Sequence, residues 1–501
     1  MRGPAKHLTK GVAIYGAGEA ITTVVNFLLL GVYVKYDILT TVDYGALALI
    51  LAAETFAKVM SRWGLDGAFM RFYHDREEGS ARRRMTSSIV WFMVVANGTA
   101  TAAALAASPW IAARLSLDPG YVTALRLMFL NIGLMAFTFV PLHTMRMRNQ
   151  AATYSAFIFA RSVGTIVLRV VLIIGLGFGI TGMYLADVLL TLVLLPCMWP
   201  WFRPLMGWTF SASELRQALR FGLPRLPAGL ASQALDSTPK ILLGQHFAQS
   251  RIGVYQNGTT LGSAVAFFKT AFETAWAPFY YETARTPEAK VVFSKMATYG
   301  IAVLVLLVAG TVVVARDVVL LILTPEYLDA VPVVPMIGLA MALQGVYQLT
   351  SIGLNLTNRT EFYSVATITA ALVGLAAGLW LVPAHGVVGA AATALVAYAT
   401  QALLAGALAH RLYPVRYEIG RIARVAAAGA GAVLVGRALP DLPPLAGFLA
   451  RGTATVLAYA ALLWVSGFFR PTERAFMREM TVRLRRRRAA AAPKPSAIDA
   501  G

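Results

Sequence analysis

Long apolar runs recur along the chain, and they limit what it can fold into. Each run is about 20 residues long, which is the length of helix that crosses the roughly 30 Å hydrocarbon core of a bilayer. Hydrophobic residues make up 58% of the 501 residues and charged residues only 14%, whereas about 25% of the residues of soluble domains are charged. The sequence therefore predicts an all-α integral membrane protein that crosses the bilayer many times.

About fourteen transmembrane helices are expected from these runs. The connections on the side away from the N-terminus are short, the longest running from about Arg316 to Val331, and they leave no room for a soluble catalytic domain. The expected helices cover roughly 11–34, 43–66, 86–108, 121–144, 154–176, 179–201, 220–243, 252–280, 292–315, 332–354, 360–382, 385–410, 421–438 and 446–468.

Lys and Arg are distributed unequally between the two sides of this arrangement. If the N-terminus is cytoplasmic, most of the 44 Lys and Arg lie in the cytoplasmic loops and the termini. This bias is what the positive-inside rule requires, so both termini are predicted to be cytoplasmic. The excess of Arg over Lys, with abundant Ala and Gly, suggests a GC-rich bacterial source and hence the bacterial inner membrane. The loops of the other side contain only Lys35, Arg114, Arg251, Arg316 and Arg437.

The net charge of +20 raises the question of a nucleic-acid partner. The most basic segment is the run Arg485–Arg488 in the tail 469–501, and this tail directly follows a membrane helix. Anionic lipid headgroups account for such a segment more simply, so anionic lipids are the expected partner and nucleic acid is not. The Ala- and Pro-rich end beyond Ala489 is expected to be disordered.

An internal repeat is visible when the chain is aligned with itself at an offset of about 208 residues. Six expected helices separate equivalent points, so the two copies have the same orientation in the membrane, as in transporters built from parallel repeats. We expect a cytoplasmic N-terminus (1–10), two six-helix lobes (11–210 and 211–410) around a central cavity, and two additional helices (411–468). The matches are Gly45 with Gly253, Met145-x-Met147-x-Asn149 with Leu354-x-Leu356-x-Asn358, Tyr154-Ser155 with Tyr363-Ser364, and Gly179-x-x-Gly182 with Gly386-x-x-Gly389.

Charged residues inside the expected helices are the most informative residues for function, because each costs about 2.5 to 3.5 kcal/mol at mid-helix on insertion scales. They must therefore face one another or water. Basic residues outnumber acidic ones. The basic residues are Lys58, Arg62, Arg161, Arg169, Arg225, Lys240 and Lys269, and the acidic residues are Glu54, Asp187, Asp236 and Glu273.

Some of these charges can pair within one helix. Glu54 with Lys58, Lys269 with Glu273, and Asp236 with Lys240 are each four residues apart, which places both members on one helix face. A purely structural role for these pairs is the alternative to a binding role. Pairing leaves four arginines with Asp187 as the one remaining carboxylate, and this excess of positive charge predicts an anionic ligand. Arginine suits such a ligand because its planar guanidinium binds phosphate oxygens in pairs.

Several kinds of catalytic site are absent from the sequence. It has no GxxxxGK[ST] motif for ATP and no Asp-x-Asp pair for the metal of a nucleotide sugar. The six histidines are scattered without metal-ligand spacing, and the single cysteine, Cys197, excludes a thiolate metal site. The sequence thus predicts no catalytic residue, no metal site and no cofactor.

Motifs in the seventh and eighth expected helices resemble a known family. The resemblance extends over about residues 8–468 and includes Tyr44-Gly45 near the start. The chain is similar to the polysaccharide transporter family of lipid-linked oligosaccharide flippases, within the multidrug/oligosaccharidyl-lipid/polysaccharide exporter superfamily. The motifs are Phe221-Gly222-Leu223-Pro224 with Pro227, Asp236, Lys240-Ile241-Leu242-Leu243-Gly244, Gly253-Val254-Tyr255 and Ala275-Trp276-Ala277-Pro278-Phe279.

The resemblance implies two lobes that alternate between inward-open and outward-open forms and move a polyprenyl-pyrophosphate-linked oligosaccharide to the outer leaflet, for cell-surface or exopolysaccharide biosynthesis. It also implies polysaccharide polymerases or glycosyltransferases as partners. Lys58, Arg62 and Lys269 would bind pyrophosphate or acidic sugars, with Arg161 and Arg169 as further candidates. Glu54 and Glu273 would bind a coupling cation, H⁺ or Na⁺.

The seventh helix departs from the family pattern. The family commonly has an acidic residue followed at once by Arg or Lys there, whereas Asp236 is separated from Lys240 by three residues. This departure places a coupling role of Asp236 in question.

Three other functions remain open from the sequence. A cation-coupled exporter of drugs or small metabolites would use the same fold, but its cavity would favour carboxylates and aromatic residues over arginines. A membrane glycosyltransferase or polymerase would need the catalytic parts that are absent. A scaffold for a polymer-synthesis complex would tolerate removal of the charges at Lys58 and Arg62.

Overall fold

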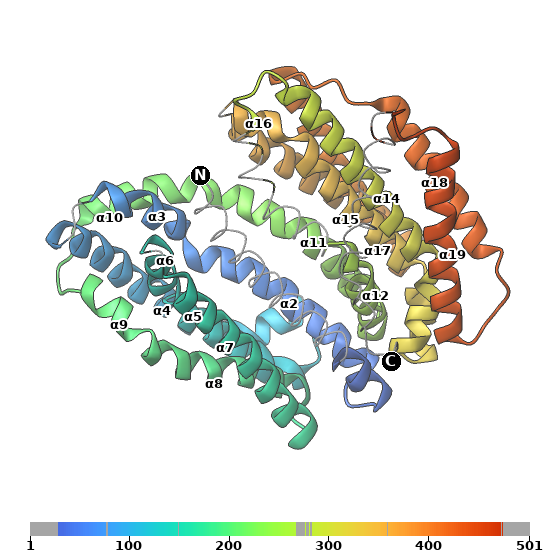
Figure 1. The fold of residues 1–501 in the computed structure, drawn as a ribbon. Helices are drawn as coiled ribbons and strands as arrows, with labels where there is room; N and C mark the ends of the chain where they lie inside the picture. Colours follow the sequence, from blue (N-terminus) through green and yellow to red (C-terminus); the bar gives the residue numbers. More distant parts are fainter. Residues whose placement is uncertain are drawn as a thin grey trace, which may run out of the picture.

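The computed structural model describes residues 29–76, 79–148, 150–266, 276, 280, 283–357, 359–471 and 473. Within these residues the chain is helical and contains no β-strand (Figure 1). Ten of the described helical segments are long and apolar enough to cross a membrane. These observations confirm the predicted all-α membrane protein. The predicted N-terminus (1–10), Lys269, Glu273 and nearly all of the tail (469–501) lie outside the described residues.

The first half of the described chain forms one group of helices (Figure 1). Residues 29–35 are helical and belong to the first predicted span. The elements that follow are α2 (Thr41–Arg62), α3 (Leu65–Asp75), α4 (Ser80–Arg114), η1 (Pro119–Tyr121), α5 (Val122–Met135), α6 (Phe139–Met147), α7 (Ala151–Arg169), the π-helical η2 (Val170–Gly175), α8 (Gly179–Cys197), α9 (Trp199–Phe202) and η3 (Arg203–Leu205).

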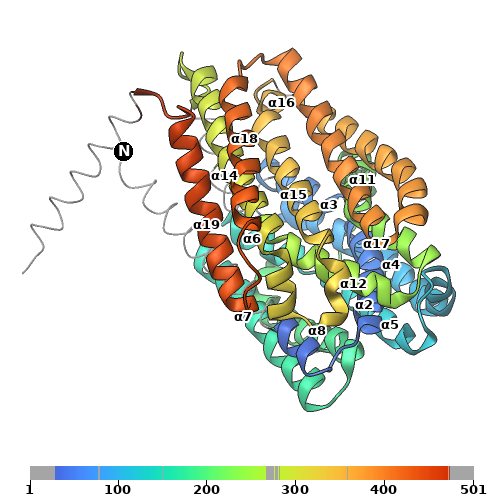
Figure 2. The same cartoon turned by 90° about the vertical axis from the view of Figure 1, so that its right-hand side faces the viewer.

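The second half forms the other group, apart from residues 212–222, which pack against α3 and α4 of the first group (Figure 1). Each predicted span from residue 43 onwards contains a described helix. The two groups are seen again, turned by 90°, in Figure 2. The elements are α10 (Ala212–Gly222), η4 (Leu223–Arg225), α11 (Leu226–His246), α12 (Gln249–Gly262), α14 (Ala289–Ile322), η5 (Pro325–Ala330), α15 (Val333–Thr350), α16 (Ile352–Leu356), α17 (Glu361–Leu412), α18 (Ile419–Arg437) and α19 (Pro444–Val465).

A sharp bend at one glycine divides α17 into the two spans that the sequence predicts. Gly386 has φ 56° and ψ −126°, a backbone conformation that side chains with a Cβ rarely adopt. Gly179, its partner in the predicted repeat, has φ 53° at the start of α8. The same unusual conformation at both positions supports the internal repeat.

The polar contacts of the loops identify the two ends of the bundle. At one end, Trp91 Nε1 donates a 3.0 Å bond to the Gly207 carbonyl and Trp201 Nε1 a 2.6 Å bond to Gln150 Oε1. This is the end rich in arginine, which we call the basic end and which is predicted to be cytoplasmic. At the opposite end, the far end, Gln249 Nε2 donates a 2.9 Å bond to the Ser116 carbonyl.

Glycines bring the two halves into backbone contact at both ends of α2. At the far end, a Cβ added to Gly45 would lie 1.9 Å from the Gln249 carbonyl oxygen, and one added to Gly253 would lie 2.0 Å from that of Thr41. At the basic end, a Cβ on Gly64 would lie 2.4 Å from the carbonyl oxygen of Gly222. Because Gly45 and Gly253 are equivalent in the repeat, α2 and α12 meet at matching positions of the two halves.

The last two helices, α18 and α19, pack against α14 (Figure 2). At the far end, Arg451 Nη1 lies 2.9 Å and 3.0 Å from the two carboxylate oxygens of Asp317. At the basic end, Arg421 lies 2.8 Å from Glu418 and 3.0 Å from Glu473. The far-end ion pair therefore joins α19 to α14, whereas the ion pairs at the basic end join α18 to the segment that follows α19.

Candidate functional site

Charged and polar residues of α2 face the first half of the molecule. Lys58 Nζ lies 2.5 Å from Glu54 Oε1, which is the pairing that their spacing predicts. The Glu54 side chain is only 9% exposed, and the hydroxyl of Tyr184 on α8 donates a 3.3 Å bond to its other oxygen. One turn further on, Arg62 has Asp66 at 3.5 Å. The partner of Glu54 is thus local, whereas Tyr184 connects it to a helix far away in sequence.

Arg169 and Asp187, which sequence reasoning left unpaired, form an ion pair between α7 and α8. The distance from Arg169 Nη2 to Asp187 Oδ2 is 2.9 Å, and the two side chains are 27% and 12% exposed. The two helices are consecutive and antiparallel, so residues equally far from the connecting loop come together. Arg169 is therefore already neutralised in this structure.

Asp236 and Lys240, which the spacing allows to pair, form no ion pair within 4 Å in the described part of the chain. Asp236 accepts a 2.5 Å hydrogen bond from the hydroxyl of Tyr398 on α17, a helix in close contact with α11. Lys240 is half-buried and interacts with Asp236 electrostatically at longer range.

Arg225 lies outside the membrane-spanning helices. It is exposed in η4 at the basic end, with its guanidinium carbon 4.0 Å from the centre of the Phe221 ring. At this distance the guanidinium of Arg225 makes a cation–π interaction with the Phe221 ring. Lys269 and Glu273 are outside the described residues.

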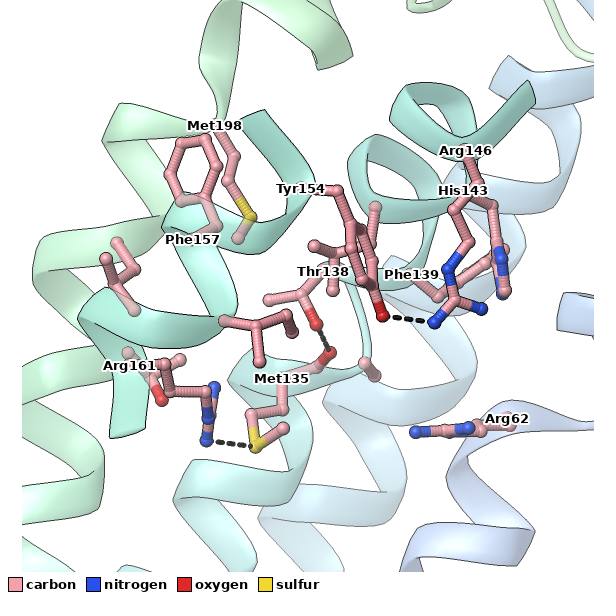
Figure 3. Close-up of a pocket in the computed structure, with 15 residues that line it drawn as sticks. Arg62, Met135, Thr138, Phe139, His143, Arg146, Tyr154, Phe157, Arg161 and Met198 are labelled. Atoms are coloured by element: carbon pink, nitrogen blue, oxygen red, sulfur yellow. Dashed lines mark hydrogen bonds between the residues drawn. The ribbon is translucent and has the colours of Figure 1, made fainter. Parts of the chain in front are cut away.

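Arg62 and Arg161, two of the predicted binding residues, line one pocket near the basic end of the first half (Figure 3). The pocket has a volume of about 280 Å³ and also contains Arg146, His143 and Tyr154. We call it the arginine pocket. Its walls come from the end of α2, the α5–α6 region, the first turns of α7 and the last turns of α8.

The three arginines approach the arginine pocket from three helices (Figure 3). Arg161 Nη2 donates a 2.9 Å bond to the sulfur of Met135, and Arg146 donates to the hydroxyl of Tyr154. None of the residues that line the pocket is an aspartate or a glutamate. Among the described residues, the carboxylate that forms an ion pair with one of these arginines is that of Asp66, at 3.5 Å from Arg62. The pocket therefore has an excess of positive charge.

Apolar residues also line the pocket. They are Phe157 and Ile158 of α7 with Leu194 and Met198 at the end of α8, and Figure 3 shows Phe157 beside Met198, away from Arg146 but on the same side as Arg161. The pocket therefore combines cationic and apolar groups, which suits an anion that carries a hydrocarbon group.

Sequence reasoning missed Arg146 and His143. Arg146 counted as a loop cation, because α5 and α6 were taken as one helix that ends before it. In the structure the helix breaks at 136–138 and continues as α6 to Met147. Both residues are therefore helical and line the pocket, His143 half-buried and Arg146 exposed. The sequence signal that could have located Arg146 is Tyr154, eight residues later, whose ring centre lies 4.4 Å from its guanidinium carbon. Among the described residues, no group of His, Cys, Asp or Glu has the arrangement of a metal site.

Comparison with protein families and solved structures identifies what the chain is similar to. A family described as "polysaccharide biosynthesis protein" matches residues 38–332. No curated protein matches the chain significantly.

Three solved structures share the fold. The lipid II flippase MurJ in an inward closed conformation has a TM-score of 0.70 at 12% identity, over 90% of this chain and 98% of that one. An inward-facing multidrug resistance MATE transporter of the MOP superfamily has a TM-score of 0.62 at 16% identity, over 81% and 95%. A MOP superfamily transporter from Pyrococcus furiosus has a TM-score of 0.51 at 16% identity, over 84% and 96%. At these identities the likeness establishes the fold alone.

Proposed function

The chain belongs to the polysaccharide biosynthesis protein family, and from this premise we propose that it is a flippase for a polyprenyl-pyrophosphate-linked oligosaccharide. It moves this lipid from the cytoplasmic to the outer leaflet of the bacterial inner membrane, for the synthesis of cell-surface or exopolysaccharide. The fold shared with the lipid II flippase MurJ is consistent with this assignment. We propose transport and no catalysis, because no set of residues for a chemical reaction was identified.

The observation that carries the proposal is the arginine pocket. Arg62, Arg146 and Arg161 line it without an aspartate or glutamate among the lining residues. Arg161 is half-buried, whereas Arg62 and Arg146 are exposed. A half-buried cation in a membrane protein favours an anionic partner, and guanidinium groups bind phosphate oxygens with two parallel hydrogen bonds. The pyrophosphate of a lipid-linked glycan carries the negative charge and the paired oxygens that would complement these arginines.

We propose alternating access of the two halves as the mechanism. The backbone contacts at Gly45 and Gly253 and at Gly64 and Gly222 hold the halves together at both ends of α2. Opening either end requires one of these contacts to separate. We also propose that a coupling cation, H⁺ or Na⁺, drives transport, and that among the described carboxylates Glu54 and Asp236 bind it.

A second candidate is a cation-coupled exporter of drugs or small metabolites, which the fold likeness to a MATE transporter favours. Cationic drugs would need carboxylates in the binding pocket, and the arginine pocket has the opposite charge. Other proposed partners are anionic lipids and the polymerases or glycosyltransferases of polysaccharide synthesis, whereas nucleic acid is not proposed.

The test is leaflet-resolved mass spectrometry of lipid-linked glycans in cells with and without the chain. The flippase proposal expects a polyprenyl-pyrophosphate glycan to accumulate in the cytoplasmic leaflet when the chain is deleted. Unchanged amounts and sidedness would contradict it and would favour the exporter, whose deletion should instead raise sensitivity to toxic compounds.

A further inference from the structure

The two halves share one apolar core at the far end but not at the basic end. The shared core joins Leu47 of α2 with Ile252 of α12 and Val333 of α15, and α2 and α12 lie side by side (Figure 1). At the basic end, the described apolar residues form separate clusters in the two halves, one around Phe69 and one around Phe293. In this structure the far end is therefore the closed end of the contact between the halves.

Four polar side chains are buried at this closed end without a hydrogen bond, and we call them the tyrosine cluster. Tyr33 and Tyr44 belong to the first half, whereas Tyr327 of η5 and Asn257 of α12 belong to the second. Their exposed fractions are 5%, 5%, 1% and 0% in that order. Neither the three hydroxyl groups nor the two polar atoms of the amide have a hydrogen-bond partner among the described residues. Buried polar groups of proteins are nearly all paired, with protein groups or with ordered water.

The tyrosine cluster is one site that both halves form. Tyr44 interacts electrostatically with Tyr33 and Tyr327. Tyr327 also interacts with Asn257, but without the geometry of a direct hydrogen bond. Asn257 follows Gly253 by four residues, so it lies one turn further along the same face of α12. The cluster therefore lies just inside the backbone contact of the two halves, where groups of one half come within electrostatic reach of the other.

Water suits the tyrosine cluster better than an ion does. Hydroxyl and amide groups both donate and accept hydrogen bonds, and a buried water typically makes about three bonds to such groups. None of the four side chains is charged, whereas hard cations in proteins are bound mainly by carboxylate and carbonyl oxygens. The carboxylate of Asp43, which precedes Tyr44, already accepts a 2.7 Å bond from the Thr40 hydroxyl and a 2.9 Å bond from that of Tyr121.

Water in this position lets the far end open without a loss of hydrogen bonds. A direct bond between the halves breaks when the halves separate. A hydroxyl group that is already bound to water exchanges it for water from outside, and water-mediated bonds are nearly as favourable as direct ones. Opening then has to expose only the apolar core and to separate the backbone contact at Gly45 and Gly253.

We propose that the tyrosine cluster binds water molecules inside the far-end contact, and that this water joins Tyr33 and Tyr44 of the first half to Tyr327 and Asn257 of the second. The site goes beyond the proposed function, because its water does not depend on the lipid that is transported. Only the exchange of this water on opening rests on alternating access.

X-ray footprinting of the purified full-length protein in detergent tests for the water directly. X-rays form hydroxyl radicals from bound water in place, so they oxidise buried side chains beside it, whereas radicals from peroxide photolysis reach exposed side chains. We expect Tyr44 and Tyr327 to be oxidised by X-rays and protected from peroxide radicals. Tyr459 is the control, because it is 4% exposed and its hydroxyl donates a 2.8 Å bond to the Ala302 carbonyl; it should be protected from both. Protection of Tyr44 and Tyr327 from both would overturn the proposal.

A double-variant cycle tests whether the water joins the two halves. Tyr44→Phe and Tyr327→Phe keep the ring and remove the hydroxyl, and each should lower the unfolding temperature by about 1 to 3 °C. The double variant should lose less than the sum, because both hydroxyls bind the same water. Tyr36→Phe is the matched control, since Tyr36 is 76% exposed at the same end, and it should leave the unfolding temperature unchanged.

Three results would overturn the proposal. An unchanged or raised unfolding temperature for Tyr44→Phe and Tyr327→Phe would mean that the hydroxyls are dry. Additive losses would mean that no shared water joins the halves. Stabilisation of the wild type by NaCl relative to choline chloride, absent from Tyr44→Phe, would mean a cation site. Footprinting of the wild type needs no variant, so it tests the site even if the variants do not fold.

The site and the flippase can fail separately. Oxidation of Tyr44 and Tyr327 by X-rays without glycan accumulation in the deletion strain would refute the flippase and leave the site. Accumulation with both tyrosines protected would leave the flippase and refute the site.

Discussion

The two halves of the molecule have the same succession of helices but different residues at equivalent positions. Aligning Tyr154-Ser155 with Tyr363-Ser364 places small residues of the second half opposite charged residues of the first. These charges of the first half therefore have no counterpart at the equivalent positions of the second half, although the backbone repeats. The equivalent pairs are Arg161 with Ala370, Arg169 with Gly378 and, from Gly179 with Gly386, Asp187 with Ala394.

Packing differs between the halves in the same way. In the second half, a Cβ on Gly378 would lie 2.7 Å from Leu242 and 3.0 Å from Thr393, so the first part of α17 packs tightly on its neighbours. In the first half, α7 leaves room for the arginine pocket. The comparison teaches that the apolar pattern sets the shared fold, whereas the charges and the packing of equivalent helices differ between the halves.

Transferring an arginine to the packed half should have the largest effect. Gly378→Arg is expected to abolish folded protein, because the side chain has no space beside Leu242 and its charge has no counterpart of Asp187 there. Fluorescence-detected size-exclusion chromatography of the expressed protein measures this. Gly378→Leu should fold in reduced amount, and Gly310→Leu, at a glycine with open space around it, should resemble the wild type. A wild-type elution profile for Gly378→Arg would contradict the claim that the second half packs more tightly at this position than the first half.

Breaking the ion pair of the first half should have the next largest effect. Asp187→Asn leaves Arg169 without its partner at 2.9 Å and should destabilise the protein by about 3 kcal/mol. Thermal unfolding in detergent measures the loss. The double variant Arg169→Met with Asp187→Leu is the control, and it should unfold close to the wild-type temperature because no unpaired charge remains. Equal unfolding temperatures for Asp187→Asn and the wild type would mean that the pair does not form.

Alanine substitutions of Gly45 and Gly253, where the two halves meet, should lower the stability of the protein by similar amounts. Gly45→Ala and Gly253→Ala each place a methyl group about 2 Å from a backbone carbonyl oxygen of the other half, so each should destabilise the protein by about 1 to 3 kcal/mol. Gly98→Ala, in an open position of α4, is the control and should be neutral or slightly stabilising. Differential scanning fluorimetry provides the comparison. Strong destabilisation by only one of the two alanines would show that the contact is not symmetric.

The smallest effect concerns the ion pair between Arg421 of α18 and Glu473, which follows α19. Burial alone would raise the pKa of Glu473, but hydrogen bonds from the Arg470 N–H, Tyr299 and Arg421 lower it further than burial raises it. A lowered pKa in the folded state stabilises the protein above the unfolded value of about 4.3 and is lost as pH falls through the folded pKa. Because the side chain is 21% exposed, we expect less than about 1 kcal/mol.

Unfolding temperatures between pH 7 and pH 3 test this contribution. The wild type should lose slightly more stability on acidification than Glu473→Gln, which has no carboxylate to protonate. A larger loss for Glu473→Gln would reverse the sign and contradict the assignment.

The sequence was sufficient for the spans and the repeat, because both depend on local patterns. Runs of about 20 apolar residues predict helices directly, and Gly179 and Gly386 mark a backbone conformation that glycine readily adopts. Partners distant in sequence could not be predicted in this way. Asp236 accepts its hydrogen bond from Tyr398 of another helix, and Arg146 lies in a helix, α6, that begins after a break the apolar pattern does not mark.

The most direct test of the account uses vesicles that contain the purified protein and a prenyl pyrophosphate-linked sugar with a fluorescent label, and it follows the transfer of label between leaflets. The wild type is predicted to transfer the lipid, the Arg62→Gln, Arg161→Gln double variant to lose at least about 90% of that rate, and the Arg216→Gln, Arg220→Gln variant of α10 to retain it. Transfer by the pocket double variant at the wild-type rate would contradict the claim that the arginines of the first half bind the transported lipid.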